Sequence, residues 1–339
     1  MAPMRWQIDG QFGTDHLRWT PAPDPVPGPG EVAIRVQAVS LNYRDLLMIR
    51  GHYNPRQPLP LVPGSDCVGE VVSTGPGVTT WRTGERVCVA FNPGWTAGPI
   101  PLNATQTTLG GPLEGVFQEF VVAPARTLVA PPAHFTAAEC ATLPCAGVTA
   151  WRALVAEGNL QADQTVLTLG TGGVSLFASQ IAQMKGARVC ITSSSEERLE
   201  RMRSLGVHHG ICYTTDERWG KTAAQWAGKG VDIVVELGGA GTLAQSLRAV
   251  KTGGTVALIG VLAGVKTDIL LTSILMRHVR VQGVFVGSTA DFRDLVACYN
   301  AHPNQRPVVD RTFPLTELPA ALQWMADGRH MGKVVLTTQ

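Results

Sequence analysis

The sequence predicts an α/β protein in which a β-barrel part precedes a doubly wound parallel sheet. The chain has 339 residues, which is enough for about two domains. Its first 145 residues are rich in Gly and Pro and contain short Val-rich segments between turns, a pattern typical of antiparallel strands. From Thr149 onward, helical periods alternate with short apolar runs, as in a parallel sheet covered by helices.

The expected elements follow from these patterns. Four Val-rich strands are expected in the first part, at residues 31–39, 67–73, 86–90 and 120–123. Five apolar runs are expected to form the parallel sheet, at residues 165–169, 187–191, 231–235, 255–259 and 279–284. Helices with ordinary start and stop residues are expected at 173–185, 196–205 and 316–327. The last run, 333–337, is expected to return as a strand to the first part.

Composition and charge exclude several classes of function. Lys and Arg total 28 against 26 Asp and Glu, and the net charge of +2 is too small for nucleic-acid binding. No stretch approaches the roughly 18 apolar residues of a spanning helix, and the first ten residues lack a secretory signal. We therefore expect a cytoplasmic protein with a small-molecule substrate and neither nucleic-acid nor membrane partners. The seven cysteines include no C-x-x-C pair, so most are expected to be core residues.

A glycine-rich loop lies between the first expected strand of the parallel sheet and the helix that follows. Gly170, Gly172 and Gly173 allow a tight turn and the close approach of a pyrophosphate to the helix start at Val174. Ser175 stands where the third glycine of the usual fingerprint would be. Glycine turns also serve simple packing, but the flanking strand and helix favour a dinucleotide-binding Rossmann domain.

The residues after the second strand favour NADP(H) over NAD(H). An NAD site would place an acidic residue there, whereas this chain has Ser193, Ser194 and Ser195, followed by Arg198. Hydroxyl groups and a guanidinium suit a 2′-phosphate. The alternative is that Ser195 only caps the next helix and that Arg198 is solvated.

Several motifs together resemble the medium-chain dehydrogenase/reductase superfamily, within its zinc-free quinone oxidoreductase-like and enoyl reductase-like branch. Besides the glycine loop, they lie at residues 28–32, 41–46, 63–71, 143–151 and 332–336. The resemblance covers nearly the whole chain. It implies a GroES-like β-barrel catalytic domain at 1–146 and 286–339, a Rossmann domain at 147–285, an active site in the cleft and a homodimer.

The resemblance also bears on metal binding. Zinc-containing relatives carry a Cys where this chain has Asn42 and a His where it has Ser65, so only Cys145 remains at a former ligand position. One thiol with an amide and a hydroxyl does not hold catalytic zinc tightly. We therefore expect no metal site.

Without a metal ion, hydrogen bonds must stabilise negative charge on the substrate oxygen, or the acceptor must be electron-poor. Tyr53 matches the tyrosine of enoyl and quinone reductases and is the expected donor, with Asn42 as a second donor. The alternatives are an aromatic residue packed at a turn and a turn asparagine whose hydrogen bonds are satisfied. Asp45 is expected to have a structural role, and the roles of Arg44 and His52 stay open.

The resemblance assigns further cofactor contacts. Thr149 matches a position at the nicotinamide end, and Tyr213 matches a tyrosine near the 2′-phosphate. Ile259, Val284 and Val286 match segments whose backbone holds the carboxamide. The sequence thus favours an NADPH-dependent reductase of a quinone or an α,β-unsaturated carbonyl. A zinc-free alcohol dehydrogenase or carbonyl reductase, and a non-catalytic NADPH-binding protein, remain open.

Overall fold

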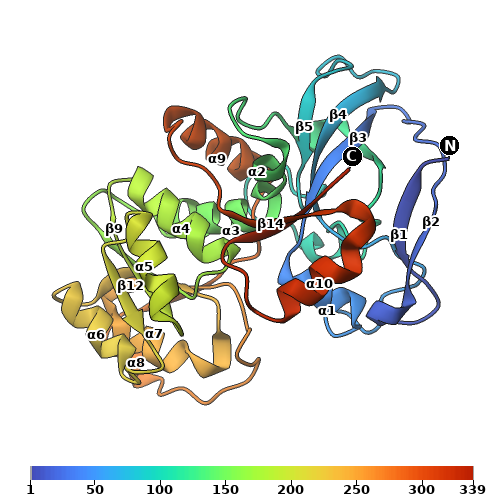
Figure 1. The fold of residues 1–339 in the computed structure, drawn as a ribbon. Helices are drawn as coiled ribbons and strands as arrows, with labels where there is room; N and C mark the ends of the chain where they lie inside the picture. Colours follow the sequence, from blue (N-terminus) through green and yellow to red (C-terminus); the bar gives the residue numbers. More distant parts are fainter. Residues whose placement is uncertain (1, 339) are drawn as a thin grey trace. The chain divides into compact units, whose positions relative to one another are not determined.

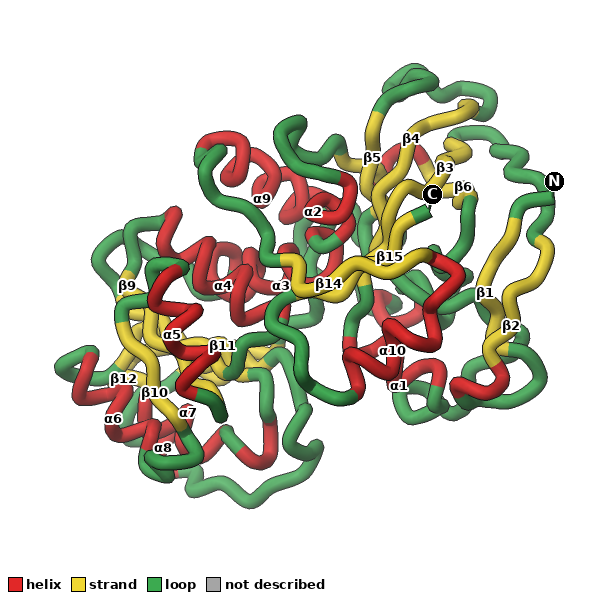
Figure 2. Tube along the Cα trace, viewed as in Figure 1, coloured by secondary structure: helices red, strands yellow, loops and turns green. Residues whose placement is uncertain are grey.

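The protein is described by a computed structural model that covers residues 2–338. The chain divides into two compact units. One contains the residues up to Val148 and those from Gly287 onward, and the other is Thr149–Val286. Figure 1 follows the chain through both units by colour, and Figure 2 marks their helices and strands.

The first unit is built on a seven-stranded sheet in the order β14-β15-β3-β4-β5-β7, in which β6 also pairs with β3, and on a two-stranded sheet of β1 and β2. Its strands are β1 (Met4–Ile8), β2 (Leu17–Pro21), β3 (Glu31–Ser40), β4 (Asp66–Thr74), β5 (Arg86–Val89), β6 (Phe120–Pro124), β7 (Leu128–Val129), β14 (Val309–Pro314) and β15 (Lys333–Thr337). The four expected strands are confirmed as β3 to β6. The last strand, β15, pairs antiparallel with β3, so the end of the chain returns to the first sheet as expected.

The helices of the first unit are α1 (Tyr43–Ile49), α2 (Ala137–Ala141), α9 (Thr289–Ala301) and α10 (Leu318–Ala326). The helix expected at 316–327 begins two residues later, because Leu315–Glu317 forms a separate 3₁₀ turn. Strands β1, β2, β7 and β14 were not expected. They are short or carry polar residues on both faces, so their apolar pattern is weak.

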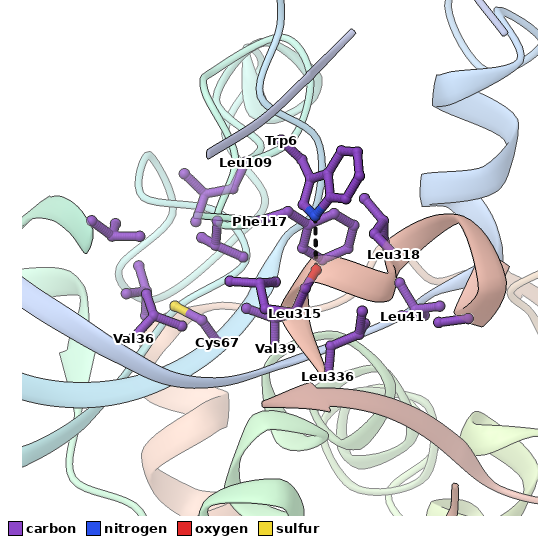
Figure 3. Packing of buried hydrophobic residues seen from close by; sticks show 14 of the residues in the cluster. Trp6, Val36, Val39, Leu41, Cys67, Leu109, Phe117, Leu315, Leu318 and Leu336 are labelled. Carbon is purple, nitrogen blue, oxygen red and sulfur yellow. Dashed lines mark hydrogen bonds between the residues drawn. The ribbon is translucent and has the colours of Figure 1, made fainter. Parts of the chain in front are cut away.

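One buried cluster connects both chain ends in the first unit (Figure 3). The indole Nε1 of Trp6 donates a buried hydrogen bond of 2.8 Å to the carbonyl of Leu315. Around this bond the labelled side chains come from β3, β4, β15, α10 and the loops between them. They are Val36, Val39, Leu41, Cys67, Leu109, Phe117, Leu318 and Leu336.

The second unit contains a six-stranded parallel sheet in the order β10-β9-β8-β11-β12-β13. Numbered along the chain, this order is 3-2-1-4-5-6, the Rossmann topology. The strands are β8 (Thr165–Leu169), β9 (Arg188–Ser193), β10 (His209–Cys212), β11 (Val231–Glu236), β12 (Val250–Leu258) and β13 (Arg280–Gly283). The helices are α3 (Val148–Trp151), which begins at the unit boundary, α4 (Gly173–Met184), α5 (Glu196–Ser204), α6 (Trp219–Trp226), α7 (Leu243–Ala249) and α8 (Thr272–Leu275).

All five strands expected for this sheet are present, and β10 is the one that the sequence analysis missed. It has four residues, and His209 and Gly210 interrupt its apolar pattern. The seven cysteines are free thiols, and five of them are buried, as expected for core residues. Among residues 2–338, no helix has both the length and the apolar character needed to cross a membrane.

A glycine beside the buried cluster of the first unit yields a test of its packing. Gly64 has a φ of +89°, and a Cβ added there would lie 2.2 Å from the Phe117 ring. We expect Gly64→Ala to lower the free energy of unfolding by about 1–2 kcal/mol from the backbone and about 1–3 kcal/mol from overpacking. Urea denaturation measures the sum.

Gly77 provides the matched control. It has a similar φ of +81°, but nothing lies within 4 Å of an added Cβ. Gly77→Ala should therefore lower the free energy of unfolding only by the backbone contribution, about 1–2 kcal/mol. Equal losses in the two variants would contradict tight packing of Gly64 against Phe117.

Candidate active site

Asn42 lies immediately before α1, and both the nitrogen and the oxygen of its side-chain amide form hydrogen bonds. The Nδ2 group donates to the Ser65 hydroxyl at 3.3 Å, and the Oδ1 atom accepts from the ammonium of Lys333. Because the ammonium can only donate, it fixes which end of the amide is the oxygen. The Asp66 carboxylate also accepts a hydrogen bond from the Asn42 side chain, which lowers the pKa of that carboxyl. Asn42 is therefore oriented as a donor, and it is partly exposed.

Lys333 is the first residue of β15 and is only 4% exposed. Its ammonium donates to the carbonyl of Leu41 as well as to Asn42, and lies 3.9 Å from Oδ2 of Asp66. Asp66 is fully buried and also accepts from the Ser65 hydroxyl at 2.9 Å and the Cys145 amide at 3.2 Å. Burial raises the pKa of the Asp66 carboxyl, and the nearby Lys333 opposes that rise. These groups form one buried polar network behind Asn42.

Asp45 stabilises the start of α1, in agreement with its expected structural role. Its Oδ2 atom accepts the backbone N–H of Asn42 at 2.8 Å. Burial raises the pKa of this carboxyl to about 6, although the guanidinium of Arg44, 3.8 Å away, favours the charged form. Asp45 thus fixes the backbone at Asn42, while Lys333 fixes its side chain.

Arg44, whose role the sequence left open, supports Tyr53. Its guanidinium donates to the carbonyls of Leu109 and Gly111, at 2.9 and 3.1 Å. It also lies 5.0 Å from the centroid of the Tyr53 ring and 4.9 Å from that of Phe91, within the range of cation–π contacts. Tyr53 is 44% exposed. Its ring is therefore held against an anchored cation while the residue remains accessible to a substrate.

In the second unit, the glycine loop connects β8 to α4. Gly170 has a φ of +73°, which favours glycine, and its N–H donates to the carbonyl of Thr192 in β9 at 2.9 Å. A Cβ added at Gly170 or Gly172 would meet nothing within 4 Å, so the space above the loop is open. The buried hydroxyl of Ser175 donates to the carbonyl of Leu169 at 2.6 Å. The serine at the third fingerprint position thus ties the helix to the strand.

The loop and the start of α4 fit a pyrophosphate. Gly172 is the N-cap of this twelve-residue helix and provides no capping side chain. The amides of the first turn have no acceptor within the helix, and the helix dipole favours an anion there. Gly173 and Val174 supply such amides. The open space and these donors fit the phosphates of a dinucleotide.

The residues expected near a 2′-phosphate lie where β9 and β10 end. Ser193 is buried, and its hydroxyl accepts the Ser195 amide at 3.2 Å. Ser194 is exposed. Ser195 caps α5 by accepting the amide of Arg198, as its alternative interpretation expected. Tyr213 is 43% exposed, and its N–H donates to the Ser193 carbonyl at 3.0 Å. Ser194 and Tyr213 therefore offer accessible groups after β9 and β10, and Arg198 lies in the first turn of α5, which follows β9.

The other expected cofactor residues follow strands at the same sheet edge, with one exception. Ile259 comes directly after β12, and Val284 comes directly after β13. Val286 follows with a φ of +46°. Because the strands are parallel, these segments share the carboxyl edge with the glycine loop, where ligands bind in such sheets. Thr149 instead lies in α3 and is buried.

The residues at the former zinc-ligand positions do not fit a zinc ion. The oxygen of Asn42 accepts from the Lys333 ammonium, which is itself a cation. Burial and the charge of Asp66 raise the pKa of the Cys145 thiol, whereas zinc binds the thiolate. In the described part of the chain, no three His, Cys, Asp or Glu side chains form a group that could hold a metal ion.

Three contributors to this site had no assigned role in the sequence: Arg44, Asp66 and Lys333. Arg44 and Asp66 lie inside motifs that the sequence analysis quoted, but their contacts with Tyr53 and Lys333 join segments far apart in the chain. Lys333 gave a usable signal, because a lysine at the head of the apolar run Lys333–Thr337 needs a partner if it is buried.

Comparisons with known proteins agree with this architecture. Residues 28–133 match the family model "Alcohol dehydrogenase GroES-like domain", and residues 173–301 match "Zinc-binding dehydrogenase". A zinc-type alcohol dehydrogenase-like protein of Schizosaccharomyces pombe is 42% identical, over 91% of each chain. Acryloyl-coenzyme A reductase of Metallosphaera sedula is 29% identical, over 93% of this chain and 94% of that protein.

A solved structure of a similar protein has the same fold over nearly the whole chain. The crystal structure of a putative alcohol dehydrogenase from Sinorhizobium meliloti 1021 has a TM-score of 0.92, with 39% identity and 99% of each chain covered. The fold, the matched family models and these relatives agree over nearly the whole length. The chain belongs to the medium-chain dehydrogenase/reductase superfamily and is an oxidoreductase.

Proposed function

We propose that this oxidoreductase is a metal-independent, NADPH-dependent reductase of an activated acceptor, either a quinone or an α,β-unsaturated carbonyl. The observation that carries the proposal is the orientation of Asn42. Lys333 occupies its oxygen, so an amide N–H donor stands where zinc-containing relatives carry a ligand. A hydrogen-bond donor stabilises an oxyanion most usefully when the acceptor is already electron-poor.

Tyr53 is proposed as the second group that acts on the acceptor. Reduction builds negative charge on the acceptor oxygen, and a phenol O–H can donate to that oxygen or supply its proton. The contact with Arg44 orients the ring, and its exposure leaves room for a substrate. The relative named acryloyl-coenzyme A reductase supports a conjugated carbonyl as substrate.

The second unit is proposed as the NADP(H)-binding domain and the first as the catalytic domain. When bound, the dinucleotide supplies the hydride. The glycine loop, Gly170, Gly172 and Gly173, and the α4 amides up to Val174 would hold its pyrophosphate. Ser194, Arg198 and Tyr213 would hold the 2′-phosphate, with Ser193 supporting them from its buried position. The remaining contacts are proposed at Thr149, Ile259, Val284 and Val286.

An assay of NADPH oxidation against quinones, enones, aldehydes and ketones tests this function. We expect turnover with quinones or enones, unchanged by a metal chelator. Turnover only of aldehydes or ketones would instead support an alcohol dehydrogenase-type reaction, the activity suggested by the name of the 42%-identical relative. Activity that is lost to a chelator and restored by zinc would contradict the metal-independent reaction.

The 2′-phosphate assignment is tested at Arg198. We expect the protein to bind NADPH more tightly than NADH. Arg198→Ala should reduce this difference in affinity. A charge-assisted bond to phosphate contributes about 1.5–3 kcal/mol, or roughly ten- to a hundredfold in the dissociation constant. Calorimetry with both cofactors measures this, and Arg203→Ala, at a residue paired with Glu200, is the control. Equal affinities of the unsubstituted protein for both cofactors would disprove the assignment.

The role of Tyr53 is tested by Tyr53→Phe. Loss of one donor to an oxyanion costs about 10²–10³ in rate, so single-turnover reduction should slow while NADPH affinity is retained. Tyr43→Phe is the matched control, because Tyr43 is also exposed but makes no such contact with Arg44. A folded Tyr53→Phe protein that reacts at the unsubstituted rate would show that Tyr53 only packs.

A homodimer is proposed through the edge of the second unit's sheet. β13 is the last strand and pairs only with β12, so its other edge can pair with a second copy. Exposed apolar residues precede it, including Leu271 and Leu275, which are 69% and 71% exposed. Light scattering should give about twice 36.1 kDa, and Leu271→Lys/Leu275→Lys should give the monomer mass. A monomer mass for the unsubstituted protein would refute the assignment. Val26→Lys, at an exposed residue of the first unit, is the control and should keep the dimer mass.

A further inference from the structure

A pocket of about 670 Å³ opens on the second unit beside α6 and is lined by five cations. They are Arg218, Lys221, Lys229, Arg248 and Arg277. No Asp or Glu lines the pocket. Over the described residues, none of the five forms an ion pair with a carboxylate. The pocket therefore concentrates positive charge on a chain whose net charge is only +2.

The cations are arranged along α6 and around the end of α7. Arg218 and Lys221 are three residues apart and so share one face at α6, about 4.5 Å apart along its axis. Arg248 lies in the last turn of α7. The guanidinium of Arg277 donates to the carbonyls of Leu247 and Val250, which holds it at the end of that helix. At least one of the five charges is thus fixed in place.

The pocket is separate from the candidate dinucleotide site. Lys229 precedes β11, Arg248 precedes β12 and Arg277 precedes β13, so the pocket borders the amino ends of these strands. The glycine loop follows the carboxyl end of β8. Because the strands are parallel, these three cations and the glycine loop lie at opposite edges of the sheet, while Arg218 and Lys221 lie at the start of α6. The cofactor assignment therefore does not account for these cations.

We propose that this pocket binds an oligophosphate, a ligand with two or three linked phosphate groups, either alone or as part of a nucleotide. Like charges gathered in a concave surface repel one another, and a multivalent anion removes that repulsion. Arginine binds phosphate through two parallel hydrogen bonds, and lysine binds it as a compact charge. The volume lies in the range of small-molecule sites, about 300–1,000 Å³. A linear chain of phosphates matches cations spaced along a helix better than a single phosphate does.

Titration calorimetry on the full chain, with sodium tripolyphosphate as the probe, tests the site. We expect binding that weakens as sodium chloride is raised, because the contacts are ionic. Lys221→Gln/Arg248→Gln should weaken binding by about tenfold or more, since one lost charge-assisted contact can have an effect of that size. Both side chains are exposed, and glutamine is a good helix former, so the fold should be retained.

Two control variants make the result specific. Arg82→Gln/Lys266→Gln removes two exposed cations outside the pocket and should leave the affinity unchanged. Arg198→Gln removes a cation proposed for the 2′-phosphate, so it reports any tripolyphosphate that binds at the candidate dinucleotide site instead of in the pocket. Loss of binding in Arg198→Gln, with the pocket variant unaffected, would place the anion at the cofactor site and overturn the proposal.

Binding measurements with ATP and with lipid vesicles identify the molecule that carries the phosphates. Tighter binding of ATP than of tripolyphosphate supports a nucleotide, and equal binding supports a bare oligophosphate. The proposal fails if the unsubstituted protein binds neither. It also fails if the pocket cations are needed only for binding to phosphatidylserine vesicles, which would make this face a membrane-contact surface.

Discussion

One buried ammonium group constrains the whole candidate active site. Lys333 comes from the last strand of the chain, yet it donates to Leu41 and Asn42 and lies near Asp66. An ion withdrawn from water costs several kcal/mol unless its partners compensate. The segments that carry these partners must therefore meet at the ammonium. The orientation of Asn42 and the position of the turn before α1 follow from that requirement.

Much of the fold was predictable because it depends on local periodicity. The apolar runs of β8, β11 and β15 appear in the sequence at their observed bounds or within one residue of them. The missed strands, such as β10, are too short or too polar to leave a pattern. The site was less predictable. Asn42 and Tyr53 were found through motifs, but the contacts that orient them come from Arg44 and Lys333 through tertiary folding.

The serines after β9 show a related limit of sequence interpretation. A helix cap and a phosphate ligand both require a small hydroxyl residue near a helix start. The sequence alone gave Ser193 and Ser194 the same role. The structure separates them, because Ser193 is buried and holds the Ser195 amide, Ser194 is exposed, and Ser195 is the cap. Ser193 is the last residue of β9 and pairs with Cys212 of β10, a strand that was not predicted, whereas Ser194 and Ser195 lie beyond that pairing.

The return of β15 to β3 has a consequence for synthesis of the protein. Residues Ala38–Ser40 pair with a strand made nearly 300 residues later. Translation adds about 5–20 residues per second, so this edge of β3 waits on the order of ten seconds or longer for its partner. All six strands of the second unit leave the ribosome during that interval. An unpaired edge readily adds strands from other chains. During synthesis this part of β3 is therefore an edge through which the nascent chain can pair with other chains until β15 has been made.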